Sequence, residues 1–525
     1  MNTTPQLLRV SDYVRSHAMQ RPTATAMTLR ETEVSYAELA SRVDELARAL
    51  LAAGIRKGDR VATLQTPSPD YVVAFLATAS IGAIWVGLNP RYTSDELVRV
   101  VADAEPALLL TRTRVGERQY DAEIAALRSC SAGLRRVVVF DGDPVIDGID
   151  SMRRFVAAGP DVSDESLASA RSACDPRDPC LIVYTSGSTG APKGALLHHE
   201  GMVAVSRAQN QAWPVAPYSI VNYFPINHIG CVVDCTIPCI VAGGTLHFLE
   251  QFEPRACLEL MASKRVTIWG SVPSAFQLQL DVEGFEEFDL RAIQLIVWGG
   301  AAMPAPLIER LFRISRRLGT NYGMSESCGM ITVVEPTDDV DILAHSVGHA
   351  DPDVEVRLAA QDGAGTGAGE IQVRSRRNTL GYWRNAQATA AAFTADGFLR
   401  TGDLATRRPD GRYRLVGRLT DMYKSGGYNV YPREIESLLE QHPAVAQVAV
   451  ISVPDPLWQE VGVAFVTAAG ALTDVELESF CRAHLAHYKV PKRFVLEPDL
   501  PLLPIGKIDR RALRERASRL MRRPP

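Results

Sequence analysis

The chain has 525 residues, of which 46% are hydrophobic and 22% are charged. These fractions are close to those of globular proteins, and the length corresponds to about three or four domain-sized units. The formal net charge of −5 argues against general electrostatic binding of nucleic acid or of an acidic membrane surface. A local basic pocket for an anionic small molecule is compatible with this charge.

The start of the chain and its cysteines indicate where the protein works. Residues 1–22 contain no long apolar segment of the kind found in secretory signal peptides. The longest apolar stretches, such as residues 72–88, are interrupted by small and polar residues, so they favour buried helix and strand over a membrane span. Nine cysteines without a signal peptide are typical of reduced thiols. We therefore expect a cytoplasmic protein.

The first three hundred residues alternate helical and strand patterns. Residues 35–54 predict a helix with Ser35 as N-cap, Glu38 three residues later and Gly54 as the stop signal. A strand, a helix and a second strand are expected in residues 59–90. This order predicts an α/β fold with doubly wound, parallel sheets. Further strands of the same kind are predicted at residues 136–140, 180–187, 243–249, 266–272 and 292–300.

The pattern changes near residue 345. Residues 353–375 alternate apolar and polar side chains around a Gly-rich turn, which predicts antiparallel hairpins and a β-barrel-like subdomain. Residues 411–442 pass from strands through a glycine pair into a helix. We predict a large N-terminal domain, residues 1–418, and a small, mobile α+β domain, residues 419–525.

Cys231, Cys235 and Cys239 recur at every fourth residue and so share one face of a predicted helix. Three thiols could ligate a metal, but collinear ligands do not readily close a tetrahedron and Pro238 interrupts the run. Ordinary packing, beside a pocket, is the favoured interpretation.

A polar loop, "YTSGSTGAPKG" at residues 184–194, directly follows a predicted strand. Its backbone N–H groups and hydroxyls can wrap phosphate oxygens, and Lys193 adds a positive charge. The loop is not a Walker A motif, because no Gly-Lys-Ser or Gly-Lys-Thr run closes it. On composition alone, a flexible surface loop is the alternative.

The same string resembles the phosphate loop of the adenylate-forming superfamily, which includes acyl-CoA synthetases, peptide-synthetase adenylation domains and firefly luciferase. Later strings resemble further motifs of that superfamily, in order and across more than three hundred residues. The resemblance is closest to acyl-CoA ligases. The strings are "GGAAMP" at 299–304, "NYGMSES" at 321–327, "SVGHA" at 346–350, "TGDLA" at 401–405, "GRLTDMYKSGGYNVYPREIE" at 417–436 and "PIGKIDR" at 504–510.

The resemblance implies two half-reactions with ATP, Mg²⁺ and coenzyme A. A carboxylate first attacks the α-phosphorus of ATP and expels pyrophosphate, and the thiol of coenzyme A then attacks the acyl-adenylate and releases AMP. The first step brings anionic groups together, so it needs cations and hydrogen-bond donors aimed at the α-phosphate.

The resemblance gives four residues catalytic roles. Lys507 matches the adenylation lysine, although a solvated loop charge is the alternative. Glu326 matches the magnesium-binding glutamate, which suits a hard cation. Ser325 stands where the family most often has threonine. His228 matches an aromatic or histidine gate between acyl pocket and thiol tunnel, although a lone histidine is more often structural.

The nucleotide site is implied by matching positions. Tyr322 and Gly323 would lie against one side of adenine, with Gly299, Gly300 and Ala301 along the other. Each of these, taken alone, is more often ordinary core or turn. Asp403 and Arg418 match the pair that binds the ribose. The residues implied to hold the phosphates are Thr185, Ser186, Gly187, Thr189 and Lys193.

The second half-reaction is implied to use the C-terminal domain. Lys424, Gly426 and Gly427 match the segment that swings in and leaves room for a pantetheine arm; a plain hairpin turn is the alternative. At the hinge, the family usually has Asp or Lys where this chain has Thr420, which puts an electrostatic trigger for domain rotation in doubt.

The acyl pocket is implied to lie near three segments, and its bulky residues favour a small, aromatic, alicyclic or medium-chain acid. Its predicted residues are Gly230, Cys231, Asp234, Trp298, Met324, Cys328 and Met330. If Asp234 faces the pocket, it would pair with a hydroxyl or a cationic group, such as the one a carnitine-like substrate carries. The favoured alternative is that Asp234 caps a helix or forms a salt bridge elsewhere.

Other functions compatible with the sequence are a free-standing enzyme that loads the phosphopantetheine of a carrier protein, a catalytically silent nucleotide-binding protein and a luciferase-like oxygenase. Retention of Lys507, Glu326, Asp403 and Arg418 argues against the silent form. A small-molecule carboxylic acid is the expected partner, and the family precedent is a monomer or homodimer.

Overall fold

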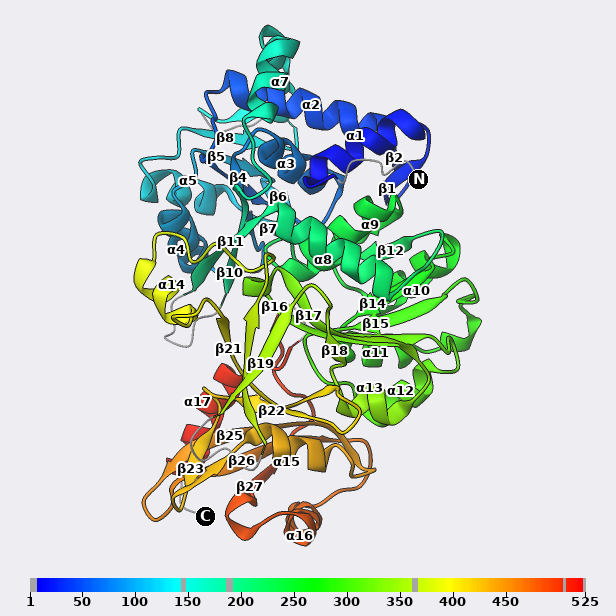
Figure 1. Cartoon of the computed structure of the whole chain (residues 1–525), viewed down its shortest axis with the longest axis vertical. Helices are drawn as coiled ribbons and strands as arrows, with labels where there is room; N and C mark the ends of the chain where they lie inside the picture. Colours follow the sequence, from blue (N-terminus) through cyan, green and yellow to red (C-terminus); the bar gives the residue numbers. More distant parts are fainter. Residues whose placement is uncertain (1–6, 143–147, 186–191, 361–366, 504–506, 523–525) are drawn as a thin grey trace.

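Figure 1 shows the computed structural model of the chain. The structure describes residues 7–142, 148–185, 192–360, 367–503 and 507–522. The N-terminal elements lie in the upper part of the view, and the last hundred residues form a separate lower part around β23, β25 and β26. Within the described ranges, no helix is both long and apolar enough to cross a lipid bilayer.

The first large sheet has seven strands, in the order β11-β10-β4-β3-β5-β8-β9. All neighbours are parallel except β11, which is antiparallel to β10. The strands are β3 (Arg60–Leu64), β4 (Ile84–Leu88), β5 (Leu108–Thr111), β8 (Arg136–Val139), β9 (Asp150–Ser151), β10 (Pro179–Thr185) and β11 (Lys193–His198). The helices of this region are α2 (Tyr36–Ala52), α3 (Pro69–Ser80), α4 (Ser94–Ala104), α5 (Asp121–Cys130), α6 (Met152–Ala157) and α7 (Asp164–Ser172).

The second large sheet has nine strands, in the order β18-β17-β16-β15-β14-β12-β13-β1-β2, with a parallel centre and antiparallel edges. Its strands are β1 (Thr25–Leu29), β2 (Thr32–Ser35), β12 (Ser219–Asn222), β13 (Thr245–Phe248), β14 (Ile268–Ser271), β15 (Leu295–Trp298), β16 (Leu318–Met324), β17 (Gly329–Thr337) and β18 (His349–Ala350). Its helices are α1 (Val10–Gln20), α8 (His199–Ala212), α9 (Ile237–Ala242), α10 (Pro254–Ser263), α11 (Pro273–Leu280), α12 (Ala305–Leu311) and α13 (Val340–His345).

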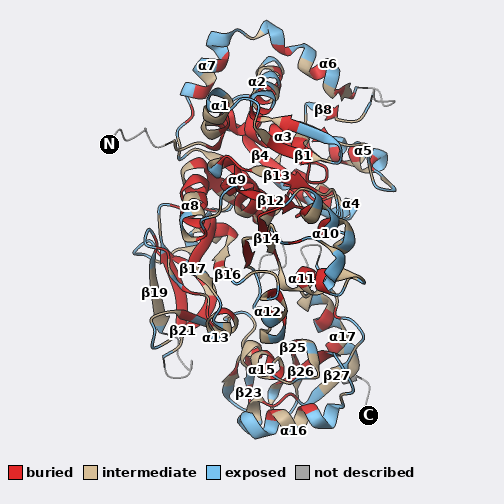
Figure 2. Cartoon of the chain, turned by 90° about the vertical axis from the view of Figure 1, so that its right-hand side faces the viewer, coloured by how far each residue is buried: buried red, intermediate tan, exposed pale blue. Residues whose placement is uncertain are grey.

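The two sheets share α3, which contacts β1 of one sheet and β3, β4 and β10 of the other. This helix is apolar on all sides and almost entirely buried, as expected for a helix enclosed between two sheets. Figure 2 shows the buried residues gathered around α3, β4 and β1. The α/β class and the doubly wound, parallel order predicted from the sequence are confirmed. Ser35 caps α2 by accepting a hydrogen bond from the backbone N–H of Glu38.

The subdomain expected to be barrel-like is a four-stranded antiparallel sheet, in the order β19-β20-β21-β22. Its strands are β19 (Glu355–Ala360), β20 (Gly369–Arg374), β21 (Leu399–Arg407) and β22 (Tyr413–Arg418), and α14 (Ala386–Ala392) lies between β20 and β21. The hairpin predicted in residues 353–375 is formed by β19 and β20. Residues of this sheet pack with Tyr322 and Ile331 in one small core, which joins the subdomain to the second sheet.

The C-terminal part has its own sheet, in the order β24-β23-β26-β25, with β27 beside β26. Along β25 successive side chains enter two cores: Val448 and Val450 pack toward α15 and α16, whereas Ala449 and Ile451 pack toward α17. A sheet covered on both faces by its own helices has what an independent domain requires. Its elements are β23 (Tyr423–Ser425), β24 (Tyr428–Val430), α15 (Pro432–Leu439), β25 (Val445–Asp455), β26 (Gln459–Ala468), α16 (Asp474–His484), β27 (Arg493–Leu496) and α17 (Arg510–Arg522).

The segment with three regularly spaced cysteines is not a uniform α-helix. Residues Gly230–Thr236 form a π-helix that continues into α9, with Pro238 in the first turn of α9. Cys231, Cys235 and Cys239 are buried, free thiols, which agrees with the packing interpretation. A wider turn than expected therefore sets which side chains of this segment face its neighbours.

Candidate active site

The polar loop is carried by two paired strands. Thr185 ends β10 and lies opposite Lys193, which begins β11. Ser186, Gly187 and Thr189 lie outside the described residues. The Lys193 ammonium lies 5.4 Å from the ring centroid of Tyr382, a distance at which a cation interacts with an aromatic face.

Tyr382 is a site residue that the sequence analysis missed. The segment around it runs beside β11: Leu196 N–H donates to Gly381 O at 2.9 Å, and Trp383 N–H donates to Gly194 O at 2.7 Å. This pairing joins residues almost two hundred positions apart. The only local signal in the sequence is the aromatic pair after a glycine in "TLGYW", residues 379–383.

Glu326 lies in a single 3₁₀ turn, Ser325–Ser327, between β16 and β17. Its side chain is buried, and Oε1 accepts hydrogen bonds from the Tyr382 hydroxyl at 2.8 Å and the Thr185 hydroxyl at 3.4 Å. For Oε2 the structure gives no hydrogen-bond partner among the described residues. A buried carboxylate beside the end of β10 fits Mg²⁺, which takes one or two carboxylates together with substrate phosphates. Ser325 lies buried in the same turn.

A carboxylate and a guanidinium form the next part of the site. Asp403 on β21 and Arg418 on β22 are cross-strand neighbours, and Arg418 Nε donates to Asp403 Oδ1 at 2.6 Å. The Tyr322 hydroxyl donates to Asp403 Oδ2 at 2.8 Å. Burial and the neighbouring Asp403 carboxylate keep the pKa of Tyr322 well above its usual value, so the hydroxyl stays a donor. Both oxygens of this buried carboxylate are therefore held in place.

Gly299, Gly300 and Ala301 follow directly after β15. A β-carbon at Gly299 would lie 2.7 Å from Oδ1 of Asn321, and one at Gly300 would lie 2.8 Å from Cε of Lys507. Gly300 also has a φ of +79°. The backbone conformation of Gly300 therefore favours glycine, and a side chain at this position would force the end of the Lys507 side chain to shift.

Lys507 is brought to this place by the C-terminal part of the chain. Leu503 N–H donates to Lys507 O at 2.7 Å, and Leu502 pairs with Ile508, so these contacts hold the backbone of Lys507 shortly before α17. Burial and the positive charge of Arg418 lower the pKa of Lys507, while Asp403 and Asp234 raise it. The structure thus brings Lys507 close to Gly300, and its charge interacts with those of Arg418 and Asp403.

His228 precedes the π-helix, and its Nδ1 accepts a hydrogen bond from Gly230 N–H at 3.0 Å. Burial, followed by the positive charge of Lys507, lowers the pKa of His228 to about 4. The imidazole is therefore neutral at pH 7. A neutral imidazole near Lys507 avoids the repulsion that a second cation would introduce.

The residues predicted for the acyl pocket fall into two groups. Trp298, Cys328 and Met330 are buried at the ends of β15 and β17, whereas Gly230 and Met324 are partly exposed. Cys231 is fully buried, and its thiol donates to the Tyr71 hydroxyl on α3 at 3.4 Å. The sulfur of Cys231 therefore lies toward α3.

The contacts of Asp234 differ from those that the sequence interpretation favoured. Among the described residues its carboxylate neither caps a helix nor forms an ion pair. Its backbone oxygen accepts from Gln209 Nε2 at 3.0 Å, and a β-carbon at Gly329 would lie 3.0 Å from its Oδ1. Burial raises the pKa of Asp234 to about 7, although the positive charge of Lys507 opposes this shift. The prediction that Asp234 caps a helix or forms a salt bridge elsewhere was wrong: Lys507 acts on its charge, but within the described residues no donor lies within hydrogen-bond or salt-bridge distance of its carboxylate.

The glycine pair forms a two-residue hairpin turn between β23 and β24, with φ values of +57° at Gly426 and +85° at Gly427. The hairpin is bonded to its own domain: Lys424 N–H donates to Glu460 Oε2 at 3.2 Å and Gly426 N–H to Trp458 O at 2.8 Å. The structure thus does not bring the hairpin to the Glu326 turn. Thr420 is exposed in the turn directly after β22.

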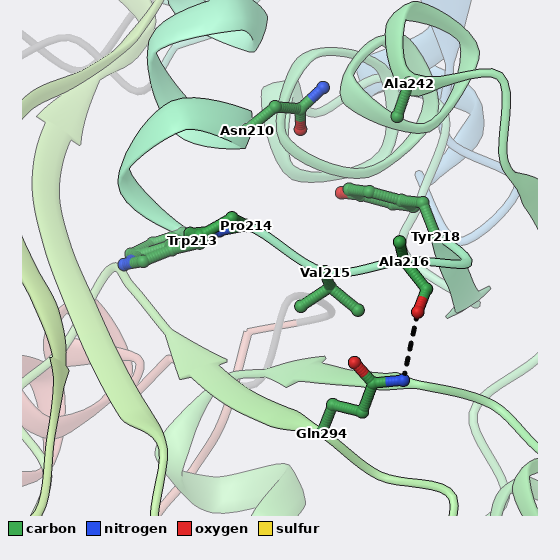
Figure 3. Close-up of a pocket in the computed structure, with 8 residues that line it drawn as sticks. All are labelled: Asn210, Trp213, Pro214, Val215, Ala216, Tyr218, Ala242 and Gln294. Atoms are coloured by element: carbon green, nitrogen blue, oxygen red, sulfur yellow. Dashed lines mark hydrogen bonds between the residues drawn. The ribbon is translucent and has the colours of Figure 1, made fainter.

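A surface pocket of about 340 Å³ lies at the end of α8 (Figure 3). Its lining comes from the end of α8, the segment that follows, the end of α9 and the approach to β15. Gln294 closes one side by donating to Ala216 O at 3.3 Å. The lining residues are Asn210, Trp213, Pro214, Val215, Ala216, Tyr218, Ala242 and Gln294.

Comparison with protein families agrees with this arrangement. Residues 14–383 match the family described as AMP-binding enzyme, and residues 434–507 match its C-terminal domain. The chain belongs to the AMP-binding enzyme family. The predicted domain boundary at 418/419 falls between the two matched segments and stays a prediction.

Relatives of this AMP-binding enzyme align over nearly the whole chain. It is 32% identical to the indoleacetate–CoA ligase of Aromatoleum aromaticum, over 98% of this chain and 99% of that protein. It is 34% identical to a feruloyl-CoA synthase of an Amycolatopsis species, over 95% and 97%. A crystal structure of the anthranilate CoA ligase AuaEII with anthranoyl-AMP has a TM-score of 0.87 and covers both chains fully, at 23% identity. That last likeness concerns the fold.

Replacing Asp234 with Asn should change how stability depends on pH. The folded-state pKa of about 7 lies above the unfolded value of about 4. The folded protein therefore keeps a proton that the unfolded chain releases, and the contribution of Asp234 to the free energy of unfolding falls as pH rises from about 4 to 7. Asp234→Asn should leave stability nearly unchanged at pH 4.5 and raise it by several degrees in Tm at pH 8.

Thermal unfolding of the wild type and Asp234→Asn across this range measures the difference directly. Lys507, Tyr218 and Cys235 interact electrostatically with Asp234, but they are common to both proteins and cancel in the comparison. A Tm difference that does not vary with pH would contradict the raised pKa.

Proposed function

We propose that this enzyme is an ATP-dependent carboxylic acid–CoA ligase, which forms an acyl-adenylate and then a CoA thioester, releasing pyrophosphate and AMP. The observation that carries the proposal is the meeting of Lys507 with Gly300, Arg418 and Asp403. Its family and its relatives over the full chain, several of which are CoA ligases, support the same reaction.

In the first half-reaction an oxygen of the acid attacks the α-phosphorus of ATP, and the bond to pyrophosphate breaks. Lys507 would hold the carboxylate and an α-phosphate oxygen together, because one ammonium can donate to both. Asp403, held by Tyr322 and Arg418, would accept hydrogen bonds from the ribose hydroxyls. Glu326 would bind Mg²⁺, which neutralises charge on the phosphate oxygens.

In the second half-reaction the thiol attacks the acyl carbon, and the bond to AMP breaks. The side chain of Lys507 lies against Gly300, and it would have to leave before a thiol enters. Rotation of the C-terminal domain about Thr420 would remove the lysine and bring in the hairpin of Lys424, Gly426 and Gly427. The turn at Thr420 lies between two domains that have separate cores, which supports a hinge there.

The substrate we propose is an aromatic or alicyclic carboxylic acid. The buried side chains of Trp298 and Met330 would bound the pocket, since a protein core does not yield to a longer chain without rearrangement. Relatives named for indoleacetate and ferulate favour the same class. Transfer to a carrier-protein phosphopantetheine is the alternative acceptor. A cytoplasmic location and a monomeric or homodimeric state stay predictions from the sequence.

A panel of carboxylic acids tests the function. Purified enzyme is assayed for AMP formation with ATP and Mg²⁺, with CoA or a phosphopantetheinylated carrier protein as acceptor. We expect AMP and a CoA thioester in equal amounts with at least one aromatic or alicyclic acid. If AMP forms only when the carrier protein is present, the carrier protein is the acceptor in place of CoA. Absence of AMP with every acid would refute the proposal.

Substituting Lys507 with Ala should separate the half-reactions. We expect carboxylate-dependent pyrophosphate exchange to fall by at least 10²-fold, because the ammonium that joins the two anions is lost. Reaction of a synthetic acyl-adenylate with CoA should stay within about threefold of wild type. An equal loss of activity in both assays would contradict the role assigned to Lys507 in adenylation.

Substituting Gly427 with Leu should do the reverse. The turn is exposed and nothing lies within 4 Å of an added β-carbon, so the side chain would fill space that the pantetheine arm needs. We expect thiolation to fall at least tenfold with pyrophosphate exchange unchanged. Gly397→Leu is the matched control, since Gly397 has the same open surroundings and a φ of +86°. Thiolation equal in the two variants would reject the pantetheine path.

A further inference from the structure

Asp234 is a carboxylate without a partner. The structure gives its oxygens no hydrogen bond and no cation within salt-bridge distance in the described part of the chain. By contrast, the two carboxylates assigned to the nucleotide, Glu326 and Asp403, have donors on their oxygens. The side chain of Asp234 is partly exposed, so water can solvate it in the free enzyme. A ligand that covered the carboxylate without supplying a donor would leave its charge isolated from water, at a cost of several kcal/mol.

On the side of Gly329, the carboxylate of Asp234 has apolar neighbours. A β-carbon added to Gly329 would lie 3.0 Å from Asp234 Oδ1, 3.8 Å from Val205 Cγ2 and 3.9 Å from Val233 Cγ1. Gly329 has a φ of +106° and no side chain, so it neither covers nor pairs the carboxylate.

The position of Asp234 relates it to the acyl side of the site. Gly329 follows the turn that carries Ser325 and Glu326 by only two residues. Asp234 lies six residues after His228 along the helical segment that begins there, and the charge of Lys507 acts on both. The carboxylate therefore lies near Lys507 and next to Gly329, close to the groups that we propose act on the acid.

We infer that Asp234 is a specificity-determining residue, which selects acids that carry an O–H, N–H or ammonium group remote from the reacting carboxylate. The inference rests on the proposed ligase function and narrows its substrate class. An ionised carboxylate only accepts hydrogen bonds, so a donor on the acid satisfies it, whereas a methyl or hydrogen at the same place leaves it desolvated and unpaired. A site built in this way discriminates strongly against the analogue without the donor.

A protonated Asp234 would instead donate to a ketone or ether on the acid. The positive charge of Lys507 works against that form, because it stabilises the ionised carboxylate. A hydrogen-bond donor on the acid also stabilises the ionised form of Asp234. The observations thus favour donors over acceptors, and acceptor-bearing acids serve as a separate arm of the test.

Matched aromatic acids provide the experiment. Each skeleton is used with a ring hydroxyl, amino, aminomethyl, acetyl or methyl substituent, and kcat/KM for pyrophosphate exchange is measured for wild type, Asp234→Asn and Asp234→Leu. We expect wild type to prefer the best donor acid over its methyl analogue by at least tenfold. In Asp234→Leu this ratio should fall at least tenfold, through loss with the donor acid and gain with the methyl acid.

Asp234→Asn keeps an acceptor oxygen and almost the same shape, so it covers the case in which Asp234→Leu does not fold. It should lose more activity with the ammonium-bearing acid than with the phenol, since only the charge is removed. Asp161→Asn, the same change at an exposed position, should leave every ratio unaltered. Binding gives a second readout. The donor acid should raise the Tm of wild type more than the methyl acid does, whereas the two acids should raise the Tm of Asp234→Leu equally.

The outcomes are distinguishable. Robust adenylation with the same donor-to-methyl ratio in wild type and Asp234→Leu would overturn the inference and leave the ligase function standing. A wild-type preference for the acetyl acid that Asp234→Leu abolishes would also overturn it, in favour of a protonated Asp234. If wild type adenylates no acid at all, the proposed function fails and the inference fails with it.

Discussion

The site depends on one ammonium group that has to reach across from the C-terminal domain. Lys507 approaches so closely that a side chain at Gly300 would collide with it. The same charge, together with burial, keeps His228 neutral and opposes the protonation of Asp234. Burial in turn makes the charge costly, and the opposing carboxylates of Asp403 and Asp234 reduce that cost. A cation with so small a net stabilisation is suited to the withdrawal that we propose for the second half-reaction.

The rest of the site is a convergence of rigid elements from three sheets. The seven-stranded sheet contributes Thr185 and Lys193, the nine-stranded sheet contributes Tyr322 and Glu326, and the four-stranded sheet contributes Asp403 and Arg418. Hydrogen bonds from Tyr322 to Asp403 and from Thr185 to Glu326 connect these sheets without any ligand. Such cross-links hold the acceptors in place before the nucleotide arrives, which reduces the reorganisation needed at the moment of reaction.

Much of this arrangement could be predicted from local sequence patterns. The remainder depends on pairing between segments that are far apart in the sequence. The cap of α2, the hairpin of β19 and β20 and the family motifs are local, so they were predicted correctly. Tyr382 was missed because its contact with Glu326 depends on pairing with β11, far away in sequence. A hydrophobic period of 3.6 residues predicts an α-helix, so it does not predict the π-helix at Gly230–Thr236. The missing partner of Asp234 follows only from how α8, the π-helix and Gly329 assemble in space.

The three acidic residues of the site thereby fall into two kinds. Glu326 and Asp403 are assigned to parts of the substrate that never vary, the metal-bound phosphates and the ribose, and the protein supplies donors that fix them in advance. Asp234 is the carboxylate that we infer faces the acid, and among the described residues the protein supplies no hydrogen-bond donor to it. Pairing it internally would stabilise the free enzyme but remove the energetic difference between one acid and another. Leaving a carboxylate unsatisfied lowers stability in a way that only the correct ligand restores, and discrimination between substrates requires that kind of difference.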